Sequence, residues 1–308
     1  MTGKEQTNAM KIGFSLPHLH KQAHDVAKTA QFAREAEKAG AASFWVGDRN
    51  IAAVNPKAGA GGGSTIPVEY NTPADPFVTL ALAASATEYA QLGTHVLIAP
   101  LYPPVQLARS ITTLDLASGG RVLPGFGIGW SPEEYEAAGL DFHRRGARME
   151  ELLDALEIIW TRDPAEYHGA EIDIPLHHAP LKPVQRPRPP IYLGAQAEKA
   201  LRRIGRRADG WLPLCVVPHF VSVETSQAQR RIIDEAAREA GRDPSAIDTV
   251  MRVNIAAGAS PQQTADAIKT VAEATGIDHF AIETSFVAFT AEESLEIVTQ
   301  ILPLIERG

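Results

Sequence analysis

The segment that decides the fold is Gly119-Gly120-Arg121-Val122-Leu123-Pro124-Gly125-Phe126-Gly127-Ile128-Gly129-Trp130-Ser131-Pro132-Glu133-Glu134. It predicts a short apolar strand that runs into glycines and ends where a helix begins. Ser131 is a typical N-cap, Pro132 suits the first helical position, and Glu134 stands where a capping box needs an acid. Glycines at the end of a strand let a flat ligand approach the backbone, and a helix N-terminus attracts anions. The segment therefore predicts either a cofactor or anion cradle, or a tight strand-to-helix turn without a ligand.

The composition is typical of a large α/β protein. The chain has 308 residues, of which 44% are hydrophobic, enough for two ordinary domains or one barrel-sized domain. The formal net charge of -8 argues against general binding to nucleic acid or to an anionic membrane. A single cysteine, Cys215, excludes an internal disulfide and fits a reducing compartment. Because no apolar run is long enough to span a bilayer and residues 1–10 are polar, we expect a cytoplasmic protein with a flexible N-terminal tail over residues 1–10.

Strands and helices alternate about eight times along the chain. The expected strands are short and apolar on both faces, which is typical of buried parallel strands. This count and the length favour a single (β/α)8 TIM barrel over residues 11–308 rather than a doubly wound sheet. Two long segments, 48–76 after strand two and 161–189 before strand five, are expected to be insertions in that barrel. The eight strands are expected at residues 11–17, 43–47, 93–99, 121–126, 190–194, 209–213, 249–256 and 279–283.

In such a barrel, ligands bind at the C-terminal ends of the strands. Asp48 and Arg49 follow strand two directly, so we expect this polar pair to contact a ligand; the alternative is a salt bridge at a strand end. Gly194 follows strand five at the start of a helix, where residues 193–197 predict a phosphate site. Further candidates at strand ends lie at residues 95–100, 127–130, 212–214, 254 and 283–285.

Other catalytic classes find no support in the sequence. No His and carboxylate residues have the spacing of metal ligands, so no metal site is predicted. There is no G-x-S-x-G motif, and Cys215 has no evident base, which argues against nucleophilic catalysis. The basic run at residues 202–207 is interpreted as a solvated helix face, and Trp45 and Trp160 as core residues.

Several short pieces in a fixed order resemble the luciferase-like monooxygenase superfamily, which comprises flavin- and deazaflavin-dependent barrel enzymes. The resemblance is strongest up to about residue 213, and it is greatest to the branch that uses coenzyme F420 (8-hydroxy-5-deazaflavin), with FMN as the alternative cofactor. The pieces are residues 36–40 followed by 43–48, 92–96, 114–121, 125–130 with Gly139, Arg148 and Glu151, and 190–194 with 208–211.

This resemblance implies a cofactor ring at the C-terminal mouth of the barrel. It also implies a non-prolyl cis peptide at the third strand, at the positions that match His95 and Val96. The phosphate contacts of the family match glycines and neighbours after strands four and five. The candidate cofactor-binding residues are therefore His95, Val96, Gly127, Gly129, Trp130, Leu193, Gly194, Ala195 and Gln196.

One departure from the family concerns the proposed catalytic pair. Many deazaflavin relatives have an acid followed by His after strand two, and that His helps to handle a proton. Here the pair is Asp48 and Arg49, and arginine cannot act as an acid or base near neutral pH. Arg49 is suited instead to holding an anionic substrate or a deprotonated ring oxygen.

The leading prediction is a coenzyme F420-dependent oxidoreductase that transfers hydride between deazaflavin C5 and a small organic substrate, under a lid formed by residues 50–76. The first alternative is a two-component monooxygenase that uses reduced FMN and oxygen, with a separate cofactor reductase as partner. The second is a non-catalytic cofactor-binding barrel. The resemblance also implies a homodimer. No motif identifies the substrate.

Overall fold

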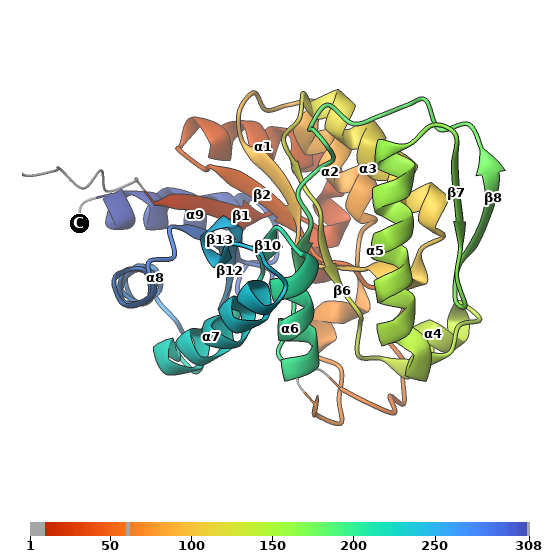
Figure 1. Ribbon diagram of the computed structural model, residues 1–308. Coiled ribbons are helices and arrows are strands. Elements are labelled where there is room, and N and C mark those ends of the chain that lie inside the picture. Colours follow the sequence, from red (N-terminus) through yellow and green to blue (C-terminus); the bar gives the residue numbers. More distant parts are fainter. Residues whose placement is uncertain (1–9, 60–61, 307–308) are drawn as a thin grey trace, which may run out of the picture.

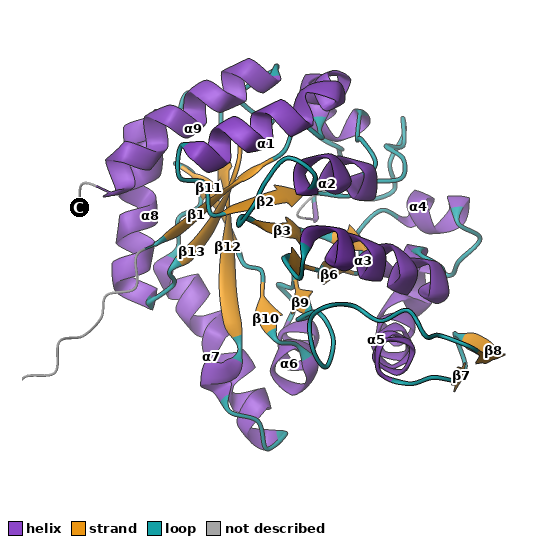
Figure 2. Ribbon diagram, turned by 90° about the horizontal axis from the view of Figure 1, so that it is seen from above, coloured by secondary structure: helices purple, strands orange, loops and turns teal. Residues whose placement is uncertain are grey.

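The structure, a computed structural model, describes residues 10–59 and 62–306. Residues 1–9 of the expected N-terminal tail lie outside the described residues. The described chain forms a curled sheet of parallel strands with helices packed around its outer face (Figure 1, Figure 2). The predicted α/β class is therefore confirmed.

The first and last strands along the chain are neighbours in the sheet. Lys11 of β1 lies opposite His279 of β13, and every pairing within the large sheet is parallel. The order is β4-β6-β9-β10-β12-β13-β1-β2-β3-β5, with β11 paired to β12. The strands are β1 (Lys11–Ser15), β2 (Ser43–Val46), β3 (Gln91–Thr94), β4 (Leu97–Ile98), β5 (Val122–Leu123), β6 (Gly125–Gly127), β9 (Tyr192–Leu193), β10 (Gly210–Trp211), β11 (Leu214–Val217), β12 (Asp248–Ile255) and β13 (His279–Glu283).

The helices form a ring outside the sheet (Figure 2). No helix in the described part of the chain is long and apolar enough to cross a lipid bilayer. The α-helices are α1 (Thr29–Lys38), α2 (Pro76–Ala84), α3 (Pro104–Ser118), α4 (Pro132–Ala137), α5 (Arg145–Thr161), α6 (Glu198–Arg207), α7 (Val223–Glu239), α8 (Pro261–Thr275) and α9 (Ala291–Glu306). Short 3-10 helices are η1 (His20–Lys28), η3 (Val68–Asn71), η4 (Ala99–Leu101), η5 (Phe142–Arg144) and η6 (Pro244–Ala246).

The strands expected at residues 93–99 and 121–126 are each divided in two. The first is interrupted between β3 and β4, and the second at Pro124, between β5 and β6. Proline has no N–H to donate to a neighbouring strand. The Thr94 hydroxyl bridges the gap, because it donates to the Gly125 carbonyl and accepts from the Gly125 N–H, each at 2.8 Å. Since β3 pairs with β5 and β4 with β6, the two breaks lie side by side.

The inner face of the sheet changes character along the strands. One part of this face is a small apolar cluster, with Val96 packed against it. The cluster comprises Trp45, Leu123, Tyr192, Leu212, Val250 and Ala281. Side chains alternate across a strand, so Arg252 and Asn254 of β12 share the inner face with Val250. They are the two residues of β12 after Asp248 that are only partly buried. Polar residues therefore replace apolar ones toward the C-terminal ends.

The two predicted insertions differ in structure. Among the described residues between β2 and α2, Gly62 and η3 are in 3-10 conformation and none is in a strand. The segment before β9, however, contains an antiparallel hairpin that periodicity did not predict, β7 (Ala165–His168) and β8 (Asp173–His177), which lies beside α5 at the edge of the molecule (Figure 1). The Glu151 carboxylate holds the hairpin turn by accepting three backbone N–H groups, those of Ala170, Glu171 and Ile172.

Two interpretations of single side chains have different outcomes. Trp45 and Trp160 are fully buried, which confirms them as core residues. The basic run of α6 is not wholly a solvated face, because Arg203 is 5% exposed. It donates to Glu150 on α5 at 2.6 Å, and pairing of this kind is what allows a guanidinium to be buried.

Buried His279 makes stability depend on pH. Burial lowers the pKa of His279 from its usual 6.5 to about 4. Between these values the unfolded chain binds a proton that the folded chain does not, so stability falls as the pH drops from 6.5 toward 4. His279→Gln removes this titration and keeps a partner for the Ser43 hydroxyl, which lies 2.8 Å from Nε2. We expect the free energy of unfolding of the natural protein to fall by about 1.4 kcal/mol per pH unit more than that of the variant.

The measurement is urea unfolding of both proteins from pH 7 to pH 4.5. The difference between the two curves isolates His279 from the other histidines. Parallel curves would contradict the assignment.

Candidate functional site

Residues predicted from two separate segments meet at the ends of β6 and β9. The backbone N–H of Gly194 donates to the Phe126 carbonyl at 2.9 Å. A small hollow opens at this point between the strands and helices α5 and α6. It is lined by Phe126, Gly127, Ile128, Met149, Leu193, Gly194, Ala195, Ala200 and Arg203, which include predicted cofactor-binding residues from both segments.

Close packing disfavours side chains at the glycines around this hollow. A Cβ atom on Gly127 would lie 2.5 Å from Val96 Cγ2, and one on Gly194 would lie 3.1 Å from Val96 Cγ1. Gly129 has φ +65° and its Cβ would lie 2.7 Å from Ile98. Val96 thus lies between the two glycine turns. The sequence pattern predicted either a ligand cradle or a tight turn there, and the structure places the Val96 side chain against the same backbone, next to the hollow.

The third strand has the backbone feature that the family resemblance implied. The peptide bond between His95 and Val96 is cis. His95 is 3% exposed, and its ring stacks on Trp45 with centroids 5.7 Å apart. Neither ring nitrogen of His95 has a hydrogen-bond partner among the described residues. Burial and the nearby Arg252 charge hold the pKa of His95 well below its usual value, so the ring is neutral.

Asp48 anchors the segment after the cis peptide. Its Oδ2 accepts from the Ile98 N–H and from the Tyr102 hydroxyl, each at 3.0 Å. Burial raises the pKa of the Asp48 carboxyl, although these two donors oppose that shift. Burial raises the pKa of Tyr102 above its usual value, and the Asp48 carboxylate raises it further. Asp48 therefore fixes the position of β4 relative to β2.

Arg49 is buried and already paired. It is 7% exposed, and its Nη2 lies 3.5 Å from Glu134 Oε2. Nε and Nη2 donate to the Ile51 carbonyl at 3.3 and 3.0 Å. The guanidinium lies 4.2 Å from the centre of the Trp130 ring, a distance at which a cation–π contact is favourable. These contacts bring the predicted residues Arg49 and Trp130 together.

The predicted capping box at the start of α4 is wrong. Ser131 makes no cap hydrogen bond, and its hydroxyl donates to Glu133 Oε2 at 2.7 Å. Glu134 turns away from the helix and accepts from the Asn50 N–H at 2.9 Å, next to Arg49. Leaving a buried guanidinium without a carboxylate costs more free energy than leaving a helix N-terminus without one capping acceptor. The acid that suggested a cap therefore holds the lid.

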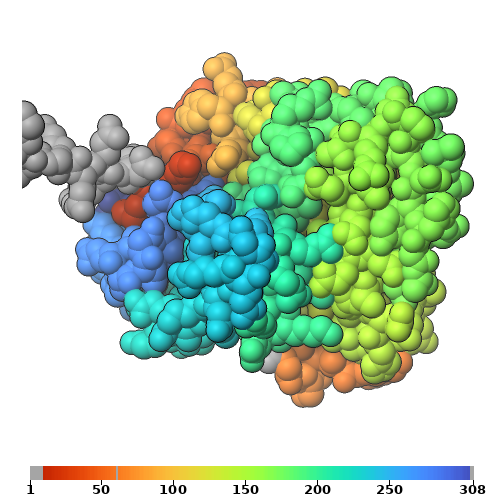
Figure 3. Space-filling view, viewed as in Figure 1, coloured from red at the N-terminus to blue at the C-terminus, as the bar shows by residue number. Residues whose placement is uncertain are grey.

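The first part of the lid is fastened to α4 at several points. The Lys57 N–H donates to Glu133 at 2.6 Å, and Lys57 Nζ donates to Glu136 at 3.0 Å. In Figure 3 the orange lid segment lies against the yellow-green segment that contains α4. Since α4 begins directly after the glycine turn of β6, the lid and the turn form one connected structure.

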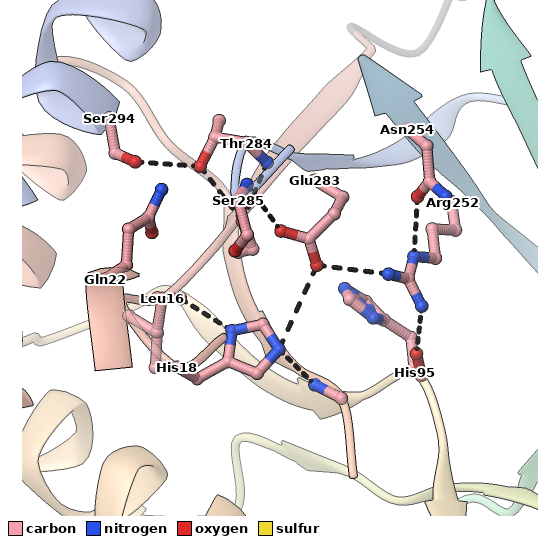
Figure 4. A network of polar contacts seen from close by, with 12 residues as sticks. Leu16, His18, Gln22, His95, Arg252, Asn254, Glu283, Thr284, Ser285 and Ser294 are labelled. Atoms are coloured by element: carbon pink, nitrogen blue, oxygen red, sulfur yellow. Dashed lines mark hydrogen bonds and ion pairs between the residues drawn. The ribbon is translucent and has the colours of Figure 1, made fainter. Parts of the chain in front are cut away.

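A polar cluster on the inner face was missed by the motif analysis (Figure 4). Arg252 donates to the His95 carbonyl at 2.9 Å, to Asn254 Oδ1 at 2.8 Å and to Glu283 Oε2 at 3.2 Å. Burial raises the pKa of the Glu283 carboxyl, whereas the charge of Arg252 and the Ser285 N–H lower it. Glu283 is fully buried, so the pair is a charge-compensated contact between β12 and β13.

His18 borders this cluster as a neutral ring. Its Nδ1 lies 2.7 Å from the Leu16 carbonyl, so Nδ1 carries the proton, and Nε2 accepts from the Gly47 N–H at 2.7 Å. Burial lowers the pKa of His18. Nε2 has no proton to offer Glu283, which lies 3.9 Å away, and the contact is therefore not an ion pair.

One sequence signal could have identified this cluster. Asn254 and residues 283–285 are predicted candidates because they lie at the C-terminal ends of strands, whereas Arg252 and His18 are not among the predicted residues. A charged residue within an otherwise apolar, buried strand is rare unless it is paired. The spacing of Val250, Arg252 and Asn254 places all three on one face, which would have predicted a paired charge inside the barrel.

The remaining predicted residue lies apart from the buried ones. Gln196 is exposed and lies two residues before α6. Ala197 is the N-cap of α6 and makes no side-chain cap, so the first N–H groups of that helix are not satisfied by a capping side chain. The donor set beside the hollow is thus suited to a phosphate group. Among the described residues, no group of three or more His, Cys, Asp or Glu is arranged to hold a metal ion.

Because the Arg49–Glu134 pair is buried, we expect Glu134 of α4 to contribute more to stability than its neighbour Glu136. Glu134→Gln leaves the Arg49 charge buried without its carboxylate, so we expect the free energy of unfolding to fall by about 3 kcal/mol. The matched control is Glu136→Gln. Glu136 pairs with Lys57 in solvent, and its loss is expected to change stability by less than about 1 kcal/mol.

Urea unfolding of the two variants and the natural protein checks this expectation. Equal stability changes in both variants would show that Glu134 contributes no more than a surface residue.

The comparisons with known proteins identify relatives over most of the chain. An uncharacterised protein of Mycobacterium tuberculosis is 34% identical over 218 residues, which cover 70% of this chain and 75% of that protein. The phthiodiolone/phenolphthiodiolone dimycocerosates ketoreductase of M. tuberculosis is 30% identical over 240 residues, covering 75% of this chain and 61% of that protein.

Solved structures share the fold at low sequence identity. The monooxygenase RslO1 from Streptomyces bottropensis has a TM-score of 0.78 at 18% identity, covering 97% of this chain and 99% of its own. An F420-dependent secondary alcohol dehydrogenase has a TM-score of 0.75 at 18% identity, with 97% and 99% covered. The FMN-containing 3,6-diketocamphane monooxygenase component of Pseudomonas putida has a TM-score of 0.73 at 17% identity, with 96% and 97% covered.

The family match extends over almost the whole described chain and agrees with the resemblance found in the sequence. It covers residues 10–297. The chain is an enzyme that belongs to the luciferase-like monooxygenase family.

Proposed function

We propose that this enzyme is a coenzyme F420-dependent oxidoreductase that acts on a small organic substrate. The observation that carries the proposal is the hollow lined by Gly127, Leu193, Gly194 and Ala195 next to the uncapped start of α6. The backbone N–H groups at this helix start, which no side chain caps, suit the phosphate end of a cofactor. A relative named as a ketoreductase supports reduction or oxidation of a carbonyl compound rather than oxygen insertion.

We further infer a closed (β/α)8 barrel formed by one domain over residues 11–308. Joining β3 to β4, β5 to β6 and β10 to β11 leaves eight strands. The two pairings between the halves of strands three and four close the circle. On this frame, the described residues between β2 and α2 and the segment that holds β7 and β8 are insertions.

The residues around the mouth suit the binding of a flat cofactor. Val96 would form the wall behind the ring, between Gly127 and Gly194. The first N–H groups of α6 and the turn before it would hold the phosphate, with Gly129, Trp130 and Gln196 at the edges. When bound, a deazaflavin supplies or accepts a hydride at C5.

Asp48 and Arg49 act in this proposal as positioning residues. Asp48 holds β4 through the Ile98 N–H. Arg49 holds the lid through Ile51 and Glu134, and a closed lid excludes water from the reacting groups. Since Glu134 compensates its charge, Arg49 is not available for either expected role, holding an anionic substrate or a deprotonated ring oxygen.

The second candidate is an FMN-dependent two-component monooxygenase, which the family description and the P. putida structure favour. A separate cofactor reductase belongs to this candidate. A homodimer and a cytoplasmic location are part of the proposal for either cofactor. A non-catalytic cofactor-binding barrel would bind a cofactor and turn over no substrate.

Two fluorescence titrations of the purified protein distinguish these candidates, one with coenzyme F420 and one with FMN. Tight F420 binding with weak FMN binding is the expected result. The reverse would favour the monooxygenase, and oxygen consumption with added reduced FMN would then test it. If neither binds at micromolar concentration, the cofactor proposal is wrong.

The glycine next to Val96 provides a matched pair of variants. Gly127→Ala places a methyl group 2.5 Å from Val96 Cγ2 and displaces the wall behind the ring, so we expect F420 affinity to fall at least about tenfold. Gly146→Ala on α5 is the control, because its Cβ would lie 3.7 Å from its nearest neighbour, Arg203.

The same F420 titration measures both variants. An unchanged dissociation constant for Gly127→Ala would place the cofactor elsewhere.

A further inference from the structure

We propose that Arg252 and Asn254 bind the oxygen of a neutral carbonyl group in the substrate. The inference rests on the proposed function only in placing the substrate at the C-terminal mouth of the sheet. The subsite comprises the free N–H groups of these two side chains, above the apolar cluster of the inner face.

Hydrogen-bond donors remain available on both side chains. Arginine has five N–H groups, and Arg252 uses one each for the His95 carbonyl, Asn254 Oδ1 and Glu283. The contact with Asn254 uses only the side-chain oxygen of that residue, which leaves the amide NH2 for another acceptor. The Asn254 amide is held in one orientation by this contact, so its donors are fixed in direction.

The position of these donors is suited to a ligand that enters from the mouth. Arg252 is 16% exposed, whereas its partner Glu283 is fully buried. Asn254 lies opposite Glu283 in the register of β12 and β13, one inward position closer to the strand end than Arg252. Figure 4 shows the Arg252 guanidinium between Asn254, Glu283 and the His95 carbonyl, so the more exposed guanidinium covers a fully buried carboxylate.

The charge balance selects a neutral acceptor. Glu283 compensates Arg252, and the neighbouring rings of His18 and His95 are neutral. At the other side of the mouth, Glu134 compensates Arg49. An anionic substrate would therefore meet no uncompensated guanidinium among these residues and would lie near buried carboxylates. A carbonyl oxygen accepts from the same donors without that repulsion.

Unsatisfied polar atoms beside the cluster point to the same ligand class. Both ring nitrogens of His95 are buried and have no hydrogen-bond partner among the described residues. Buried polar groups are normally hydrogen-bonded. A neutral polar molecule, together with ordered water, would satisfy them without adding charge.

The test uses acetamide and acetate, which have nearly the same shape and differ in charge. Crystals of the cofactor-free protein are soaked in each, and NMR titrations of the same pair give dissociation constants. In the natural protein we expect acetamide, with its oxygen on Arg252 and Asn254, to bind at least about tenfold more tightly than acetate. Preferential binding of acetate, or water alone at these donors, would overturn the proposal.

Glu283→Gln is the decisive variant, because it removes the compensating charge and keeps the shape. It is expected to reverse the preference in favour of acetate, whereas Glu292→Gln, which alters an exposed pair with Lys28, is expected to leave it unchanged. An unchanged preference in a folded Glu283→Gln protein would show that charge compensation does not set specificity.

Asn254→Ala keeps the Arg252–Glu283 pair intact and tests the subsite if Glu283→Gln does not fold. It should weaken acetamide binding about tenfold, and unchanged binding would remove Asn254 from the subsite. F420 titration of the natural protein is run in parallel. If F420 does not bind but acetamide still binds at Arg252, the proposed function is wrong and the carbonyl subsite stands.

Discussion

The structure of the mouth depends on the guanidinium of Arg252. It connects three strands that are distant in sequence, because it contacts the His95 carbonyl after β3, Asn254 on β12 and Glu283 on β13. A charge inside a sheet is tolerated only when it is paired and hydrogen-bonded. The Arg252–Glu283 pair meets this condition. Removing either partner would leave a buried charge next to the backbone that places Val96, and thus next to the proposed cofactor wall.

A second pair repeats this arrangement at the opposite side of the mouth. Arg49 and Glu134 are both buried, and they connect the lid to α4. Each pair places a carboxylate behind a guanidinium and so neutralises the site. The arginine that replaces the histidine of many deazaflavin relatives thus has a structural explanation: it fastens the lid instead of handling a proton. Because this charge is already compensated, Arg49 gives no reason to expect an anionic substrate.

Local sequence pattern predicted the order of elements well, because strands buried on both faces and capped helices leave short-range signals. The capping box of α8 at Ser260 and Gln263 is present. The same pattern failed at Ser131 and Glu134, where a buried arginine distant in sequence is the stronger partner of the acid. The hairpin of β7 and β8 was missed for a related reason, since its turn is held by Glu151. Contacts between distant residues decided each of these cases.

The glycine turns show why a motif alone could not distinguish a ligand site from a tight turn. A Cγ atom of Val96 leaves no room for a side chain at Gly127, and the other Cγ atom makes a tight contact with the Cβ position of Gly194. Packing alone is therefore sufficient to explain glycine at Gly127. The hollow beside them is what adds a binding surface, because it exposes the same backbone to a ligand. The backbone at Gly127 packs against Val96 on one side and lines the hollow on the other. A substitution at Gly127 therefore changes both the proposed wall behind the cofactor ring and the proposed phosphate site.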